Sequence, residues 1–179
     1  YGLPRQDPES FRRNLAQLID LRPDRVAVYS FAYVPWVKAN QRRLDPATFP
    51  SPEMKFELFL QALEAFATAG YAQIGMDHFA LPTDELAVAQ REGRLHRNFM
   101  GYTVMPAADQ LGFGITAIGD VRGAFVQNRK KLVGYYEALD AGVLPVERGY
   151  LLDDDDQIRR HVILRLMCNF SIDAAEVES

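Results

Sequence analysis

The sequence predicts an α/β protein, because short apolar strands alternate with longer helical segments along its first half. Helices are expected at 8–20, 52–69 and 83–93, and strands at 25–31 and 71–75. The stretches between the strands are long enough for helical crossovers, so we expect the strands to be parallel. Functional residues are then expected at 31–35 and 75–82, in the loops that follow the strands.

The three helices begin and end at residues that are typical of helix caps. Asp7 and Ser51 place a side-chain oxygen where it can accept from the first backbone N–H groups of a helix, and Thr83-Asp84-Glu85-Leu86 opens the third helix. Gly70 and Gly93 follow the second and third helices, where a left-handed residue often ends a helix.

The second half of the chain is expected to differ in character. A third short strand is expected within 111–118, where glycines allow close backbone approach, followed by a helix at 122–140. An extended stretch is expected within 143–152 and a final helix at 153–169. The run from Asp153 to Asp156 has two interpretations, a metal site or a helix start. Acidic side chains at the start of a helix complement its dipole, and this favours the helix-start interpretation.

Composition and charge exclude several classes of protein. The chain of 179 residues is 48% hydrophobic with a net charge of −4, so nothing indicates a nucleic acid or an anionic membrane as partner. No apolar run approaches the roughly 20 residues of a membrane span, and no signal peptide is evident. Cys168 is the single cysteine, which favours a cytoplasmic location and provides too few thiolates for an iron–sulfur cluster. The turn at Tyr1-Gly2-Leu3-Pro4 leads directly into a helix, so we expect a strand upstream of it.

Two polar groups are candidate sites on the residues alone. Asp77-His78 follows a predicted buried strand, where it either orients an imidazole for a polar substrate or merely caps a turn. Arg97 ends a basic cluster that either clamps carboxylates or forms a solvated helix end. The glycines at 112, 114 and 119 do not fit the dinucleotide-binding spacing G-x-G-x-x-G, and Cys168 is interpreted as a packing residue.

Several longer runs resemble one family. They are Gly75-Met76-Asp77-His78-Phe79-Ala80, Leu95-His96-Arg97-Asn98-Phe99 with Gly101-Tyr102-Thr103, Leu111-Gly112 through Ile118-Gly119, and Cys168-Asn169-Phe170. Together they are similar to the oxygen-independent coproporphyrinogen III oxidases, a family of radical S-adenosylmethionine enzymes, and the resemblance spans essentially the whole chain. It implies that 1–120 form the C-terminal half of a partial (β/α)6 barrel. Residues 121–179 are then the start of a mostly helical C-terminal domain.

The resemblance also implies an activity and its cofactors. Such enzymes are cytoplasmic and, in haem biosynthesis, decarboxylate two propionates of coproporphyrinogen III to the vinyl groups of protoporphyrinogen IX. They use a [4Fe–4S] cluster and S-adenosylmethionine. The cluster-binding cysteines lie in an N-terminal half that is not in this sequence, so we expect this chain alone to be inactive and to need that half. The electron donor is not indicated.

By the resemblance, two residues line the S-adenosylmethionine pocket and two more lie in the same cavity: Ala32 and Ile118, then Tyr29 and Phe99. Three charged or polar residues are assigned to the substrate side, because a tetracarboxylate needs cationic partners: Asp77, His78 and Arg97. No catalytic residue and no metal ligand is expected in this chain.

Two other interpretations remain open. A haem-carrying chaperone is the nearest relative of the family, and it has a His-Asn-x-x-Tyr motif. Here Arg97-Asn98-Phe99-Met100-Gly101 stands at the comparable place, which favours the oxidase. The other possibility is an isolated folding module. Half a barrel exposes strand edges and apolar surface, so such a module is expected to be unstable or to associate.

Overall fold

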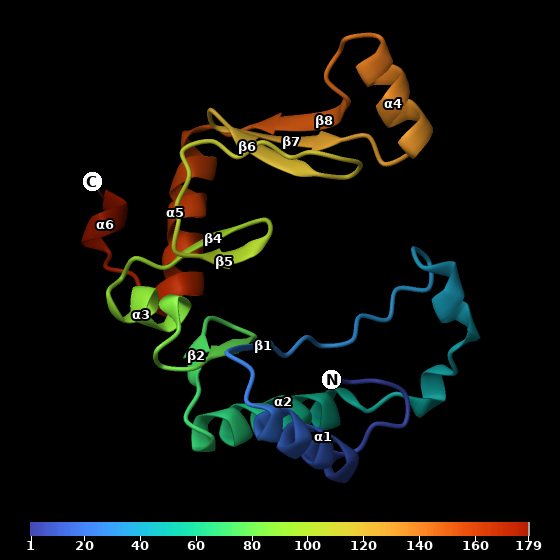
Figure 1. Ribbon diagram of the computed structural model, residues 1–179, viewed down its shortest axis with the longest axis vertical. Coiled ribbons are helices and arrows are strands. Elements are labelled where there is room, and N and C mark those ends of the chain that lie inside the picture. The colour runs from blue at the N-terminus through green and yellow to red at the C-terminus, as the bar shows by residue number, and fades with distance from the viewer. Residues whose placement is uncertain (179) are drawn as a thin grey trace. The chain divides into compact units, whose positions relative to one another are not determined.

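The computed structural model describes residues 1–178, which divide into two compact units. Unit 1 runs from Tyr1 to Arg94 and unit 2 starts at Leu95 (Figure 1). Both contain helices and strands, so the prediction of an α/β protein is confirmed. No helix in the described part of the chain is long and apolar enough to cross a membrane.

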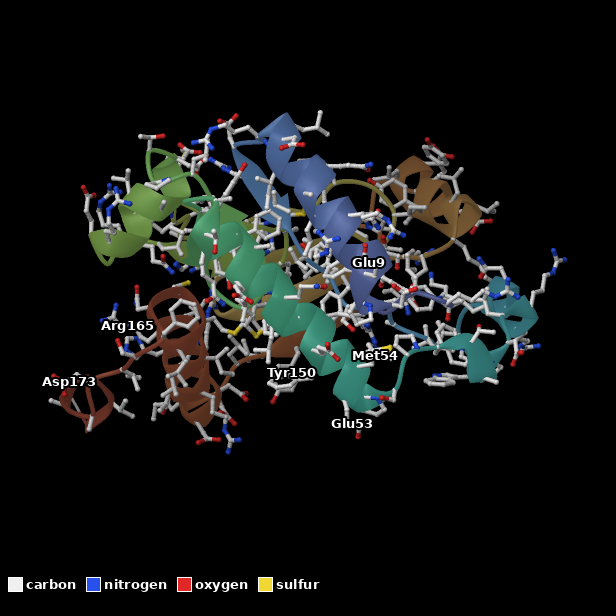
Figure 2. All side chains as sticks on the ribbon, turned by 90° about the horizontal axis from the view of Figure 1, so that it is seen from below. Glu9, Glu53, Met54, Tyr150, Arg165 and Asp173 are labelled. Carbon is white, nitrogen blue, oxygen red and sulfur yellow. The ribbon has the colours of Figure 1, made fainter. Side chains whose placement is uncertain are left out.

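Unit 1 packs two helices against each other and against a small sheet. Helix α1 (Pro8–Leu21) lies beside α2 (Pro52–Thr68), as Figures 1 and 2 both show, and the two bury Phe11, Leu15 and Leu58 between them and the sheet. The predicted caps are present. Asp7 accepts from the N–H of Ser10 at 2.8 Å, and the Ser51 hydroxyl accepts from the N–H of Met54 at 3.2 Å. Short 3₁₀ helices η1 (Ala39–Arg43) and η2 (Pro46–Thr48) lie in the connection before α2.

The sheet of unit 1 has the order β1 (Arg25–Ala27), β3 (His78–Ala80), β2 (Ala72–Ile74), and α3 (Glu85–Arg91) follows it. The two predicted strands are not hydrogen-bonded to each other, because β3 lies between β1 and β2 and is antiparallel to both. Gly75, at a φ of 74°, allows a three-residue turn that brings 78–80 back beside β2. β1 and β2 still run in the same direction, as expected for strands joined by the α2 crossover.

Aromatic rings fill the core between α2 and the sheet. Phe66 is fully buried and stacks on Phe79, with ring centroids 4.8 Å apart and planes at 26°. Tyr71 meets Phe66 edge-on at 5.4 Å, and its hydroxyl donates to the carbonyl of Pro23 at 2.7 Å. This hydrogen bond holds the end of the α1–β1 connection against the core.

Salt bridges attach β1 to the start of α3. The Arg25 guanidinium pairs with Asp84 at 2.7 Å and with Glu85 at 2.8 Å. The second oxygen of Asp84 accepts from the N–H of Leu86 at 2.8 Å, so one carboxylate both caps the helix and holds the strand.

Unit 2 contains a hairpin, a three-stranded sheet and three helices. Its elements are β4 (His96–Asn98), β5 (Gly101–Thr103), β6 (Ile118–Val121), β7 (Ala124–Asn128), α4 (Leu132–Asp140), β8 (Val146–Leu151), α5 (Asp154–Asn169) and α6 (Ala175–Glu178). β4 pairs with β5, and β6, β7 and β8 form an antiparallel sheet in that order. Helix α5 contacts β4 (Figure 1).

Two predictions for this part of the chain were wrong. Most of 111–118 is irregular, and the strand begins only at Ile118. Residues 124–128, predicted as helix, form β7, because Arg122 and Gly123 adopt φ angles of 50° and 79° and make a tight hairpin turn. Only Leu132–Asp140 of the predicted helix is helical, and the strands β7 and β8 lie among the helices after residue 120. The assignment of 121–179 to a mostly helical domain stays a prediction.

The other predictions for the second half were correct. β8 lies within the predicted extended stretch 143–152, and α5 matches the predicted final helix. Asp153 and Asp156 form a capping box at its start, which confirms the helix-start interpretation of the acidic run. The boundary between the two compact units falls between Arg94 and Leu95 in the sequence, and the assignment of 1–120 to half a barrel stays a prediction.

Candidate functional site

Unit 2 contains a cavity of about 550 Å³ between its sheet, the β4–β5 hairpin and α5. Aromatic and aliphatic side chains form its apolar walls: Phe99, Phe125, Leu152, Ile163 and Leu164. Polar side chains form the remainder: Arg97, Asn98, Asp120, Tyr150, Asp156, Arg159 and Arg160. Apolar walls with a few converging charged groups are typical of a small-molecule site.

Two aromatic rings and one arginine form one wall of this cavity. Phe99 meets Phe125 edge-on, with ring centroids 5.0 Å apart and planes at 86°. The guanidinium carbon of Arg160 lies 5.4 Å from the centroid of the Phe125 ring, within the range of a cation–π contact. Apolar surface and positive charge therefore occur side by side.

Carboxylates hold most of the charged groups in place. Arg160 makes a two-pronged ion pair with Asp120, at 2.5 and 3.2 Å, and both side chains are largely buried. Arg159 pairs with Asp155 at 2.6 Å. The hydroxyl of Tyr150 on β8 (labelled in Figure 2) donates to Asp156 at 2.9 Å, and this hydrogen bond raises the pKa of Tyr150.

Arg97 differs from these arginines in its partner. Its guanidinium carbon lies 5.6 Å from the centroid of the Tyr102 ring, across the β4–β5 hairpin. Within residues 1–178 it makes no ion pair with a carboxylate. A half-buried guanidinium of this kind is suited to an anionic ligand, because its charge is not already neutralised.

Unit 1 brings three of the predicted site residues together. The Nδ1 of His78 lies 2.6 Å from the carboxylate of Asp77, and its Nε2 lies 3.4 Å from the hydroxyl of Tyr29. Nδ1 is therefore the nitrogen directed at Asp77, and Nε2 is the nitrogen directed at Tyr29. The Tyr29 ring also meets the imidazole edge-on at 5.7 Å. This arrangement fixes the orientation of His78.

Ala32 lines a separate cavity of unit 1, of about 580 Å³. Phe31, Tyr33 and Phe49 also line it, with Phe49 in ring contact with both of the others, and Lys55 contributes a cation. The side-chain amide of Gln41 donates to the carbonyl of Ala32 at 3.0 Å and accepts from the N–H of Val34 at 2.6 Å. The backbone after β1 is therefore held in a defined conformation without regular secondary structure.

The predicted site residues thus fall into several groups. Tyr29, Asp77 and His78 form one contact cluster, while Arg97 and Phe99 line the unit-2 cavity. Ile118 lies in β6 opposite Gln127 and does not line that cavity. The structure describes these groups in two separate units, so it leaves the assignments to S-adenosylmethionine and substrate untested.

Sequence reasoning identified only Arg97 and Phe99 among the residues that line the unit-2 cavity, and it missed the cluster of Asp120, Arg160 and Phe125. Arg160 lies within the predicted final helix 153–169 and Phe125 within the segment 122–140 that was predicted as a helix, so neither was marked as a site residue. Asp120 was named only as the last residue of the predicted barrel segment 1–120. Only the pairing of β6 with β7, which places Asp120 opposite Phe125, reveals the cluster.

The residues present do not fit an iron–sulfur cluster. Such clusters are typically held by three or four thiolates, and this chain has Cys168 alone, buried on α5. Among the described residues no group of three or more His, Cys, Asp or Glu side chains is arranged to hold a metal ion.

The fold and the sequence both match radical S-adenosylmethionine enzymes. The structure superposes with a TM-score of 0.94 on an Escherichia coli protein at 46% identity, covering 99% of this chain and 41% of that one. That protein is described as coproporphyrinogen III oxidase, a radical SAM enzyme. No family profile matches the chain.

The names of curated relatives identify the kind of radical SAM enzyme to which this chain is similar. The chain is 49% identical over 179 residues to a Synechocystis protein, of which it covers 38%, and 47% identical over 178 residues to one from E. coli K12, of which it covers 39%. Both are named oxygen-independent coproporphyrinogen III oxidase. The resemblance found in the sequence is confirmed: over its whole length the chain is similar to less than half of these radical SAM oxidases.

Proposed function

We propose that this chain is part of an oxygen-independent coproporphyrinogen III oxidase, which converts two propionates of coproporphyrinogen III to vinyl groups with release of CO₂. The observation that carries the proposal is the 49% identity over all 179 residues to a protein of that name. The fold supports it, since the TM-score of 0.94 extends over 99% of the chain. Its single cysteine suits a cytoplasmic location, where thiols stay reduced.

In this proposal the residues of the chain bind and orient, while the radical chemistry comes from S-adenosylmethionine and a [4Fe–4S] cluster held elsewhere in the whole protein. Arg97 binds a carboxylate of the substrate, which is supported by the observation that it makes no ion pair within the described residues 1–178. Asp77 orients His78 on the substrate side.

The remaining assignments concern S-adenosylmethionine. We place Ala32 and Ile118 in its pocket, with Tyr29 and Phe99 beside it. Ala32 is supported by its position in the aromatic cavity of unit 1, and Phe99 by its position in the apolar wall of the unit-2 cavity.

The test compares the whole protein that contains this chain with the chain alone. Both are reconstituted without oxygen and given S-adenosylmethionine, a chemical reductant and coproporphyrinogen III labelled in the propionate carboxyl groups. The whole protein is expected to release two labelled CO₂ per substrate, and the chain alone none. A whole protein that binds haem stably and releases no CO₂ would overturn the proposal in favour of a haem-carrying function.

A further inference from the structure

The ion pair between Arg160 and Asp120 leaves part of the guanidinium available. Nη1 and Nη2 of Arg160 donate to the two carboxylate oxygens of Asp120. A guanidinium has five N–H donors, and no partner is recorded for Nε within residues 1–178. The Nε–H and the second N–H of one Nη point in the same direction and form a second fork of two donors. This second fork can donate to both oxygens of a carboxylate.

Burial makes this second fork effective. The side chains of Arg160 and Asp120 are 31% and 17% exposed, so water screens them less than it screens surface ions. Asp120 is fixed in turn by β6, which pairs with β7 and bridges to Gln110. The guanidinium is also held over Phe125, so its position is set from two sides. It needs little reorganisation to receive a ligand.

The surroundings define the chemical class of that ligand. Phe99, Phe125 and Ile163 give the cavity an apolar lining, and about 550 Å³ lies within the usual 300–1,000 Å³ of small-molecule sites. Arg97 adds a second cation to the cavity, and unlike Arg160 it makes no ion pair within residues 1–178. A flat apolar ring that carries carboxylate arms satisfies both the lining and the charges.

We propose that Arg160 is a second carboxylate-binding residue of this cavity, positioned by Asp120, and that with Arg97 it receives a propionate-bearing pyrrole ring of the substrate. This inference rests on the proposed function, since it takes coproporphyrinogen as the ligand. Asp120 is a positioning residue, because it acts on the ligand only through Arg160.

Binding to the whole protein tests the proposal, with coproporphyrin III as a fluorescent probe and its tetramethyl ester as the uncharged counterpart. Arg160→Met is expected to weaken binding of the acid by about ten- to a hundredfold and to leave binding of the ester unchanged. Arg160→Met leaves the buried Asp120 without its cation, so Arg160→Met/Asp120→Asn is measured beside it and is expected to show the same loss. Arg148→Met, a change of an exposed arginine in the same unit outside the cavity, is the matched control.

Steady-state kinetics of Asp120 variants distinguish a role in positioning Arg160 from a role in the stability of the fold. Asp120→Asn is expected to raise KM for coproporphyrinogen III several-fold with kcat little changed, and Asp120→Glu to restore part of the affinity. If the wild type decarboxylates the substrate and the double variant binds the acid as the wild type does, the inference is overturned while the proposed function stands. If the wild type neither decarboxylates nor binds the acid, both are overturned.

Discussion

The assignment of core residues in unit 1 can be tested with two phenylalanines on the same helix. Phe66 and Phe56 are both on α2, but Phe66 is 0% exposed and Phe56 is 62% exposed. Replacing Phe66 by Ala removes a ring that contacts Phe79 and Tyr71. Removing a buried Phe costs about 3–5 kcal/mol of the free energy of unfolding, because it leaves a cavity as well as losing burial. In a chain of this length that corresponds to a fall in Tm of about 6–20 °C.

The assay is urea unfolding followed by far-UV circular dichroism. Fluorescence is a poor probe here, since Trp36 is already 74% exposed in the folded state. Phe56→Ala is the control and should change the free energy of unfolding by no more than about 0.5 kcal/mol. The double change of Phe66 and Phe79 should reveal a coupling of about 0.5–1.5 kcal/mol from the stacked pair. Equal losses for Phe66→Ala and Phe56→Ala would refute the assignment of the core.

Three further predictions concern a cap, a hydrogen bond and a thiol. Ser51→Ala should lower the free energy of unfolding by about 1 kcal/mol in a urea titration, because the N–H of Met54 loses its acceptor, and Ser51→Asp should not. Tyr71→Phe should cost about 1 kcal/mol by the same measurement, since it removes only the hydrogen bond to Pro23; no change would mean that water replaces it. Burial raises the pKa of the Cys168 thiol, so the folded state should lose stability as pH rises above the ordinary thiol pKa. Alkylation by iodoacetamide at pH 8 should be much slower in the native state than in urea, and equal rates would contradict this.

Local signals in the sequence predicted the helices well. α1, α2 and α5 begin at the residues that their capping side chains indicated, since a cap involves groups only three positions apart. The missed strands depend on distant partners. β3 has only three residues and was assigned to a loop, and it is a strand because β1 and β2 pair with it from both sides. β7 was assigned to a helix because Gly123 was not recognised as part of a turn.

The candidate site was predictable only in part. Phe99 was identified by the resemblance, Arg97 by the charge of its basic cluster, and Asp77 next to His78 could be seen directly in the sequence. Arg160 was not predictable as a ligand-binding residue, because its partner Asp120 is 40 positions away and is brought to it by the sheet. Charge on a helix surface has the same pattern in sequence whether it faces water or a cavity.

The central position of β3 has a consequence for the order in which unit 1 assembles. β2 and β3 are joined by three residues, whereas β1 pairs with residues about 50 positions away. Closing the longer connection costs about 2.5 kcal/mol more in chain entropy than closing the short one. The hairpin of β2 and β3 should therefore form early and act as a template, to which β1 is added last. In amide hydrogen exchange β1 should lose protection first, so the backbone that leads into Tyr29 and Ala32 is the part of unit 1 that opens most readily.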